Sequence, residues 1–189
     1  MTILKDASLE AIIEELLIRI EDAPLRKGTL ETPSRVARAL KEMFDGYNTD
    51  IDKLFKTFDG EGQNQIVALS NIEFTSYCEH HMLPFSGFAH IAYLPKGKVI
   101  GASKMARLVA AYAHRLQIQE RMTEQIANTL MNKLNPLGVA VIIEGSHSCM
   151  KIRGIKCQNG KLVTSVMLGM FREDAGVKQE VLALLGLTK

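Results

Sequence analysis

The chain has 189 residues, which is long enough for one domain with a substantial apolar core. Hydrophobic residues make up 47% of the chain and charged residues 23%, proportions that exclude a disordered or membrane-embedded protein. The formal net charge of +2 gives no basis for binding nucleic acid by bulk electrostatics. No apolar run approaches the roughly 20 residues that a bilayer requires, so we expect neither nucleic acid nor membrane as a partner.

The cysteine content and the N-terminal sequence predict a cytoplasmic protein. Three cysteines, Cys78, Cys149 and Cys157, are too few and odd in number for a disulfide scaffold. Residues 1–6 lack the apolar core and cleavage site of a secretory signal. We therefore expect the thiols to serve chemistry or metal binding in a reducing compartment.

Two amphipathic helices are expected first. Apolar residues recur at helical spacing over residues 9–20, and Thr32-Pro33 can begin a second helix that ends near residue 46. On this second helix, Arg35 and Arg38 form either a solvated face, which is the commoner arrangement, or an anion site. We expect residues 1–60 to be a helical segment that packs on a catalytic domain of residues 61–189.

Strands and helices then alternate. Period-two and apolar patterns predict strands over residues 65–74, 85–94, 139–143 and 162–171, and helices from Ser103, over 119–134 and at the C-terminus. The helix from Ser103 carries Lys104 and Arg107 near its start. Free backbone N–H groups, a hydroxyl and two cations could hold a phosphate there, although many ordinary surface helices also begin with Ser-Lys.

A dense polar cluster, Cys78-Glu79-His80-His81, lies in the connection between the first two of these strands. Cys78 and His81 are three residues apart, so a tight turn can direct both side chains at one metal ion. Two ligands do not hold zinc, and a further donor must come from elsewhere in the chain.

That donor is expected in the segment that continues the strand over residues 139–143. If this segment stays extended, His147, Cys149 and Lys151 share a face of the strand. Cys78, His81 and Cys149 would then bind zinc and leave one position for water, as catalytic zinc sites do.

Two histidines next to these donors are candidate proton carriers. Two thiolates neutralise the charge of the ion, so a bound water is less acidified than at an all-histidine zinc site and a base becomes useful. Free imidazole titrates near neutral pH, which suits this role, so His80 and His147 are the candidates, while a hydrogen-bonded structural histidine is the alternative for each. Cys157 has no partner at ligand spacing and is interpreted as a bystander thiol.

Five motifs together resemble the GTP cyclohydrolase I family, and the resemblance covers residues 31–185. They are Cys78-Glu79-His80-His81, Val99-Ile100-Gly101-Ala102-Ser103-Lys104, Gln119-Glu120-Arg121, Ser146-His147-Ser148-Cys149 and Arg153-Gly154. The resemblance implies hydrolytic opening of the guanine imidazole ring of GTP, loss of C8 as formate, and reclosure to 7,8-dihydroneopterin triphosphate, the entry to folate or related pterins. It also implies Cys78, His81 and Cys149 as zinc ligands, and His80 and His147 as the histidines that move protons.

The resemblance further implies how the nucleotide is bound. Glu120 would accept hydrogen bonds from guanine N1–H and the 2-amino group, a pairing that adenine cannot offer. A glutamate favoured by the helix dipole is the alternative and predicts no base selectivity. The other substrate-binding residues implied are Gln119, Ser103, Lys104, Arg107 and Arg153, together with Arg35 and Arg38.

The architecture implied by the family is the α+β tunnelling fold. Its antiparallel sheet carries helices on one face, and its subunits join their sheets into a closed barrel. Two pentameric rings pair into a homodecamer with active sites at subunit interfaces. Closure is physically reasonable because it removes the unpaired sheet edges of a monomer.

Two other classes of function are considered. A zinc-dependent nucleobase deaminase also uses one histidine and two cysteines, but its His-x-Glu and Pro-Cys-x-x-Cys signatures are absent from the sequence. A non-catalytic zinc- or pterin-binding scaffold of the same fold would use the metal only to tie the loop to the strand.

Overall fold

The computed structural model describes residues 6–188, which form two compact units that divide between Asp45 and Gly46. The sequence-based division into residues 1–60 and 61–189 stays a prediction. None of the helices among the described residues is long and apolar enough to cross a membrane.

The first unit is a pair of packed helices, α1 (Leu9–Glu21) and α2 (Thr32–Met43), joined through the short 3₁₀ helix η1 (Lys27–Thr29). The Ser8 side chain caps α1 by accepting a hydrogen bond from the Ala11 N–H at 3.2 Å. Pro33 lies in the first turn of α2, where its missing N–H removes no helical hydrogen bond. Helix α2 therefore begins at the Thr32-Pro33 pair, as expected from the sequence.

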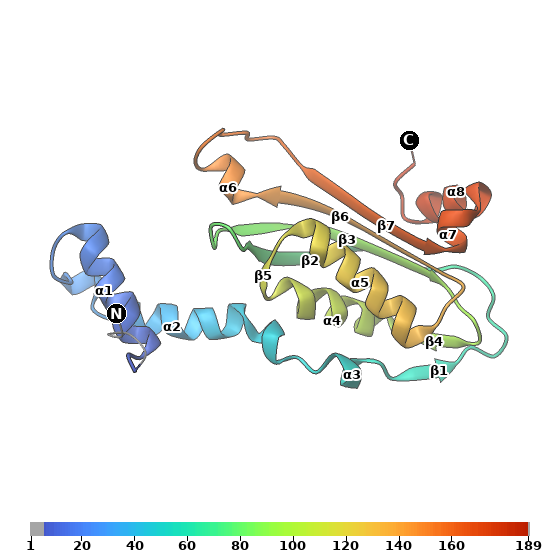
Figure 1. The fold of residues 1–189 in the computed structure, drawn as a ribbon, viewed down its shortest axis with the longest axis horizontal. Coiled ribbons are helices and arrows are strands. Elements are labelled where there is room, and N and C mark those ends of the chain that lie inside the picture. The colour runs from blue at the N-terminus through green and yellow to red at the C-terminus, as the bar shows by residue number, and fades with distance from the viewer. Residues whose placement is uncertain (1–5, 189) are drawn as a thin grey trace. The chain divides into compact units, whose positions relative to one another are not determined.

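The remaining elements follow in chain order. They are η2 (Asp45–Asn48), α3 (Ile51–Leu54), β1 (Thr57–Asp59), β2 (Val67–Cys78), β3 (Pro84–Leu94), β4 (Lys98–Ile100), α4 (Ala102–Ala113), β5 (Leu116–Gln117), α5 (Gln119–Leu134), β6 (Gly138–His147), α6 (Ser148–Lys151), β7 (Leu162–Gly169), α7 (Met170–Glu173) and α8 (Ala175–Leu184). The larger sheet has the order β5-β2-β3-β6-β7, and β1 pairs with β4 separately (Figure 1). All strand pairs are antiparallel except one: β5 pairs in parallel with the C-terminal end of β2, at Tyr77 and Cys78.

The main core lies between α4, α5 and one face of this sheet (Figure 1). Alternate residues of β3, such as Ile91 and Tyr93, point into it and are fully buried. Ala92 and Leu94 point to the other face, where Phe171 of α7 and Val181 of α8 cover one end of the sheet. The expected α+β fold is confirmed, and the C-terminal helices add a partial cover to the second face.

The segment after His147 differs from the expected extended chain. The residues from Ser148 to Lys151 form the single turn α6, in which the Ile152 N–H donates to the Ser148 carbonyl at 3.0 Å. The pairing of β6 with β3 ends at His147 and Phe85, so no neighbouring strand holds the next residues extended. The prediction that Cys149 and Lys151 share a strand face with His147 is therefore wrong.

The last strand also ends earlier than expected. Gly169, the final residue of β7, has a φ of 58°, a conformation that favours glycine. A Cβ atom there would lie 2.3 Å from the Leu137 carbonyl oxygen. The chain turns at this glycine, and the next residues, Met170 and Phe171, belong to α7 instead of the strand.

Candidate active site

The connection between β2 and β3 is a tight turn that gathers the side chains of the polar cluster. The Met82 N–H donates to the Cys78 carbonyl at 2.7 Å, and Met82 takes a positive φ of 55°. As a result, the Cys78 Sγ atom lies 3.6 Å from His81 Nδ1 and 3.8 Å from His80 Nδ1. The three-residue spacing of Cys78 and His81 thus brings their side chains together in a tight turn, as expected.

Cys149 joins this group from α6. The ligand atoms of Cys78, His81 and Cys149 all lie within 4.8 Å of one another, and no other such group occurs within residues 6–188. Burial raises the pKa of the Cys149 thiol, and the neighbouring Cys78 thiol raises it further, because two thiolates repel each other. A divalent cation would remove that repulsion, so the three side chains form a metal-capable group.

Glu79, between the donors, is engaged elsewhere. Its carboxylate accepts a hydrogen bond from Arg121, which lowers the pKa of the Glu79 carboxyl group. His80 Nε2 lies 3.9 Å from the other carboxylate oxygen. His80 is exposed and lies beside Cys78.

His147, the last residue of β6, is held from two sides. Its ring stacks on Phe85 of β3, with centroids 4.4 Å apart and planes inclined by 6°. Its Nε2 atom lies 3.0 Å from Gln119 Oε1 at the start of α5. Burial lowers the pKa of His147, and the Glu120 carboxylate acts in the opposite direction, so a neutral ring near neutral pH is expected.

Some of the predicted substrate-binding residues lie near this centre. Arg153 Nη1 is 3.0 Å from His81 Nε2, which places a cation beside the metal-capable group. Glu120 is exposed in the first turn of α5 and lines a groove of about 930 Å³ along β7. Gln119 is fully buried, so its side chain faces the protein and not this groove.

Three of the predicted substrate-binding residues lie away from the metal-capable group within the second unit. Ser103, Lys104 and Arg107 lie in the first turns of α4, whereas the end of α4 leads to β5 beside Cys78. They therefore lie toward the opposite end of the sheet in the same chain (Figure 1). Arg35 and Arg38 are exposed on α2 in the first unit, and Arg35 pairs with Glu31 at 2.5 Å.

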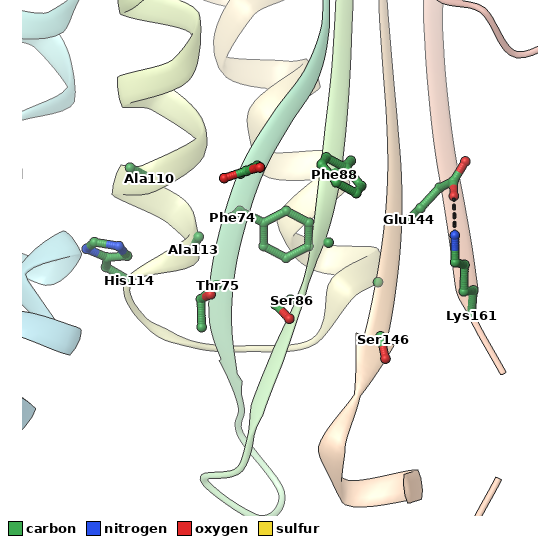
Figure 2. Close-up of a pocket in the computed structure, with 13 residues that line it drawn as sticks. Phe74, Thr75, Ser86, Phe88, Ala110, Ala113, His114, Glu144, Ser146 and Lys161 are labelled. Carbon is green, nitrogen blue, oxygen red and sulfur yellow. Dashed lines mark ion pairs between the residues drawn. The ribbon is translucent and has the colours of Figure 1, made fainter. Parts of the chain in front are cut away.

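A second hollow of about 590 Å³ lies over β2, β3 and β6, and Figure 2 shows its lining. Cross-strand neighbours Thr75 and Ser86 lie in one row, and Phe88 and Glu144 lie in the next. Lys161 pairs with Glu144 at 3.6 Å. None of the residues predicted for metal binding, catalysis or substrate binding lines this hollow among the described residues, so we do not assign the chemistry to it.

The residues that support His147 were not predicted from the sequence. Phe85 was recognised only as the beginning of a strand, and Thr164, a hydrogen-bond partner of Gln119, was not singled out. Gly145 is needed because a Cβ atom there would lie 2.1 Å from Gln119 Oε1. A single sequence offers no signal for these contacts, since each joins residues from two different secondary-structure elements.

The fold and this site belong to an α+β protein that can bind a metal through two cysteines and one histidine. The sequence profile of the family described as GTP cyclohydrolase I matches residues 9–186, and the chain belongs to this family.

Curated relatives align over nearly the whole chain. GTP cyclohydrolase 1 of Caldanaerobacter subterraneus subsp. tengcongensis is 47% identical over 178 residues, which cover 94% of this chain and 95% of that protein. The enzyme of the same name from Methylococcus capsulatus is 43% identical and covers 94% of this chain and 97% of its own length. The Bacillus pumilus GTP cyclohydrolase 1 is 45% identical over 94% of both chains.

Proposed function

We propose that this protein hydrolyses GTP to formate and 7,8-dihydroneopterin triphosphate, at the start of folate or related pterin synthesis, with zinc as its metal. Membership of the GTP cyclohydrolase I family and the near-complete alignment with enzymes of that name support this activity. The single observation that carries the location of the site is the convergence of Cys78, His81 and Cys149.

The donor set fits zinc. Two thiolates and an imidazole are ligands that zinc prefers, and three protein donors leave a position for water. Zinc, when bound, supplies Lewis acidity that makes a water molecule a better nucleophile. Because the two thiolates reduce this effect, proton transfer by a neighbouring side chain is expected to matter for attack on C8 of guanine.

His147 and His80 are the proposed proton carriers. His147 lies two residues from Cys149 in the chain, and its neutral ring can accept a proton from the attacking water. His80 lies beside Cys78, with its Nδ1 atom 3.8 Å from the thiol sulfur. The histidine that has taken the proton from water can then act as a general acid and give it to the guanine ring nitrogen that leaves C8.

Glu120 is the proposed selector of guanine. It is exposed at the start of α5, immediately after the residue that contacts His147, and it lies close enough to influence the pKa of His147. Its carboxylate can accept hydrogen bonds from both N1–H and the 2-amino group of guanine. Arg153, next to His81, is proposed to bind the ribose and triphosphate together with Ser103, Lys104 and Arg107, and with Arg35 and Arg38.

We further propose that the enzyme is a homo-oligomer, a decamer built as a dimer of pentamers, with each site shared between subunits. The separation of Lys104 from Cys78 along the sheet of one chain supports a shared site. The edge strand β7, eight residues long, can pair with a second copy. A cytoplasmic location, expected from the cysteine content, is part of this proposal.

The activity is tested by incubating purified, zinc-loaded protein with GTP and measuring pterin fluorescence and formate release. The proposal predicts both products from GTP and neither from ATP. A non-catalytic zinc- or pterin-binding scaffold would bind metal without releasing formate from either nucleotide, and that result would overturn the proposed function.

A further inference from the structure

The side chain of Gln119 is enclosed by the protein and uses all of its polar atoms inside it. Gln119 is 0% exposed, although it carries an amide with two donors and an acceptor. The amide nitrogen Nε2, whose two protons are shared among three acceptors, lies 3.0 Å from the Ile143 carbonyl oxygen, 3.0 Å from the Leu162 carbonyl oxygen and 3.1 Å from the Thr164 hydroxyl. The remaining atom, Oε1, lies 3.0 Å from His147 Nε2.

The orientation of this amide is determined by its neighbours. Ile143 and Leu162 present backbone carbonyls, which can only accept, so the amide group that faces them is the NH₂. Rotating the amide by 180° would place its oxygen against two carbonyl oxygens, with which it cannot form a hydrogen bond. Oε1 therefore faces His147.

Two threonine hydroxyls reinforce this arrangement. The Thr123 hydroxyl donates to the Gln119 backbone carbonyl at 2.7 Å, which uses its single proton. The Thr164 hydroxyl, 2.6 Å from the Thr123 hydroxyl, must then donate to it and accept from Gln119 Nε2. These three residues form a closed ring of directed hydrogen bonds, in which no group can reverse alone.

The protonation of the neutral His147 ring follows from the amide orientation. An amide oxygen only accepts hydrogen bonds, so His147 Nε2 must carry the proton that it donates to Gln119 Oε1. The other ring nitrogen, Nδ1, is then the unprotonated one, and no hydrogen-bond partner for it occurs among the described residues. Stacking on Phe85 restricts the plane of the same ring.

We propose that Gln119 is a positioning residue, which holds His147 as its Nε2–H tautomer so that His147 exchanges protons with the reacting groups through Nδ1. The role in the reaction rests on the proposed function, whereas the tautomer does not. This assignment gives the Gln119 side chain a task different from the substrate contact expected from the sequence, because its amide is buried and fully engaged.

The tautomer is tested directly by ¹⁵N NMR of full-length, zinc-loaded protein with labelled histidine. The chain has five histidines, and the His147 signals are identified by their loss in His147→Ala. The proposal predicts a protonated Nε2 and an unprotonated Nδ1 in the neutral ring without substrate. A protonated Nδ1 would overturn it, whether or not the protein acts on GTP.

The positioning role is tested by Gln119→Met, Gln119→Glu and the control Gln125→Met. Gln125 lies on the same helix and accepts a hydrogen bond from Gln117 at 2.9 Å. Gln119→Met removes the acceptor, so kcat is expected to fall about 10- to 100-fold with KM for GTP little changed and zinc content retained. Gln119→Glu keeps an acceptor and is expected to recover part of kcat, while Gln125→Met stays near wild type.

Two results of these variants would contradict the positioning role. A raised KM with unchanged kcat in Gln119→Met would mean that the side chain binds substrate. A Gln119→Met protein that keeps wild-type kcat and the wild-type His147 tautomer would mean that Gln119 has no part in holding the ring. If Gln119→Met fails to fold, the NMR measurement on the wild-type protein still decides the tautomer.

Discussion

The rings of Phe85 and His147 stack with centroids 4.4 Å apart and an interplanar angle of 6°. Phe85 is 1% exposed at the start of β3, and His147 is its cross-strand partner at the end of β6. Phe85, a residue of the hydrophobic core, thus contacts His147, a candidate proton carrier, directly.

Replacing Phe85 should therefore affect activity beyond its effect on stability. Phe85→Leu is expected to lower the free energy of unfolding by about 1–3 kcal/mol, because a buried ring is lost. It should also lower kcat about 10-fold or more, because the His147 ring is no longer held in its plane. Urea unfolding and GTP turnover measure the two effects.

Phe74→Leu is the matched control for this prediction. Phe74 is also buried and contacts Phe85 edge-on at 5.9 Å, but it has no stacking contact with His147. A similar loss of stability with kcat near wild type is expected. Equal losses of kcat in the two variants would argue that packing alone, and not the orientation of His147, explains the effect of Phe85.

The metal-capable group predicts that replacing Cys149 and replacing Cys157 have different effects on zinc binding and activity. Cys149→Ser should lose bound zinc and GTP turnover together, because a serine hydroxyl is a poor zinc ligand. Cys157→Ser should keep both, since Cys157 lies outside the group. Metal content by mass spectrometry and turnover are measured on the same preparations, and full zinc content in Cys149→Ser would exclude Cys149 as a ligand.

The buried His90 predicts a dependence of stability on pH. Burial lowers the pKa of His90 below its ordinary value of 6.5, while Glu144 acts in the opposite direction. The unfolded chain therefore binds the proton more tightly, and this contribution to stability is present above pH 6.5 and is lost as pH falls from there toward the lowered pKa.

The variant His90→Asn tests this dependence. The asparagine oxygen can replace His90 Nδ1 as the acceptor for the Asn71 N–H, which is 3.4 Å away, but it does not titrate. Between about pH 7.5 and pH 5.5, the free energy of unfolding should fall less in the variant than in the wild type. Parallel curves would contradict the assignment, because contributions from other groups and from metal are shared by both proteins.

A shared active site predicts complementation between inactive variants. Lys104→Ala and His147→Ala should each lose most activity alone, but co-expressed chains form mixed oligomers in which some sites combine both intact residues. With random assembly, about a quarter of the sites should be intact. Mixed oligomers purified through two different tags would stay inactive if Lys104 and His147 of the same chain formed one site.

The helices, the strands and the metal donors could largely be predicted, because they depend on local patterns. Helix α5 begins and ends at the expected residues, and the spacing of Cys78 and His81 suits the turn that they occupy. Cys149 was predicted as a donor on an extended chain, yet it reaches the group from α6, because strand pairing stops at His147. Cys149 thus lies in the metal-capable group although the expected local conformation was wrong.

The support of His147 could not be predicted from the sequence. Gln119 and His147 are 28 residues apart, and their contact depends on how α5 lies against β6. The position of Lys104 relative to Cys78 depends likewise on the direction of α4 along the sheet. Sequence patterns identify residues suited to a chemistry, whereas the contacts among them follow from tertiary packing.

Reversible removal of the metal tests the central claim most directly. Purified protein is treated with a chelator, freed of it, and assayed for pterin fluorescence and formate release from GTP before and after stoichiometric zinc is returned. We expect turnover to disappear with the metal and to return with zinc. Unchanged turnover in protein shown to be metal-free, or no turnover in fully zinc-loaded wild-type protein, would contradict the account.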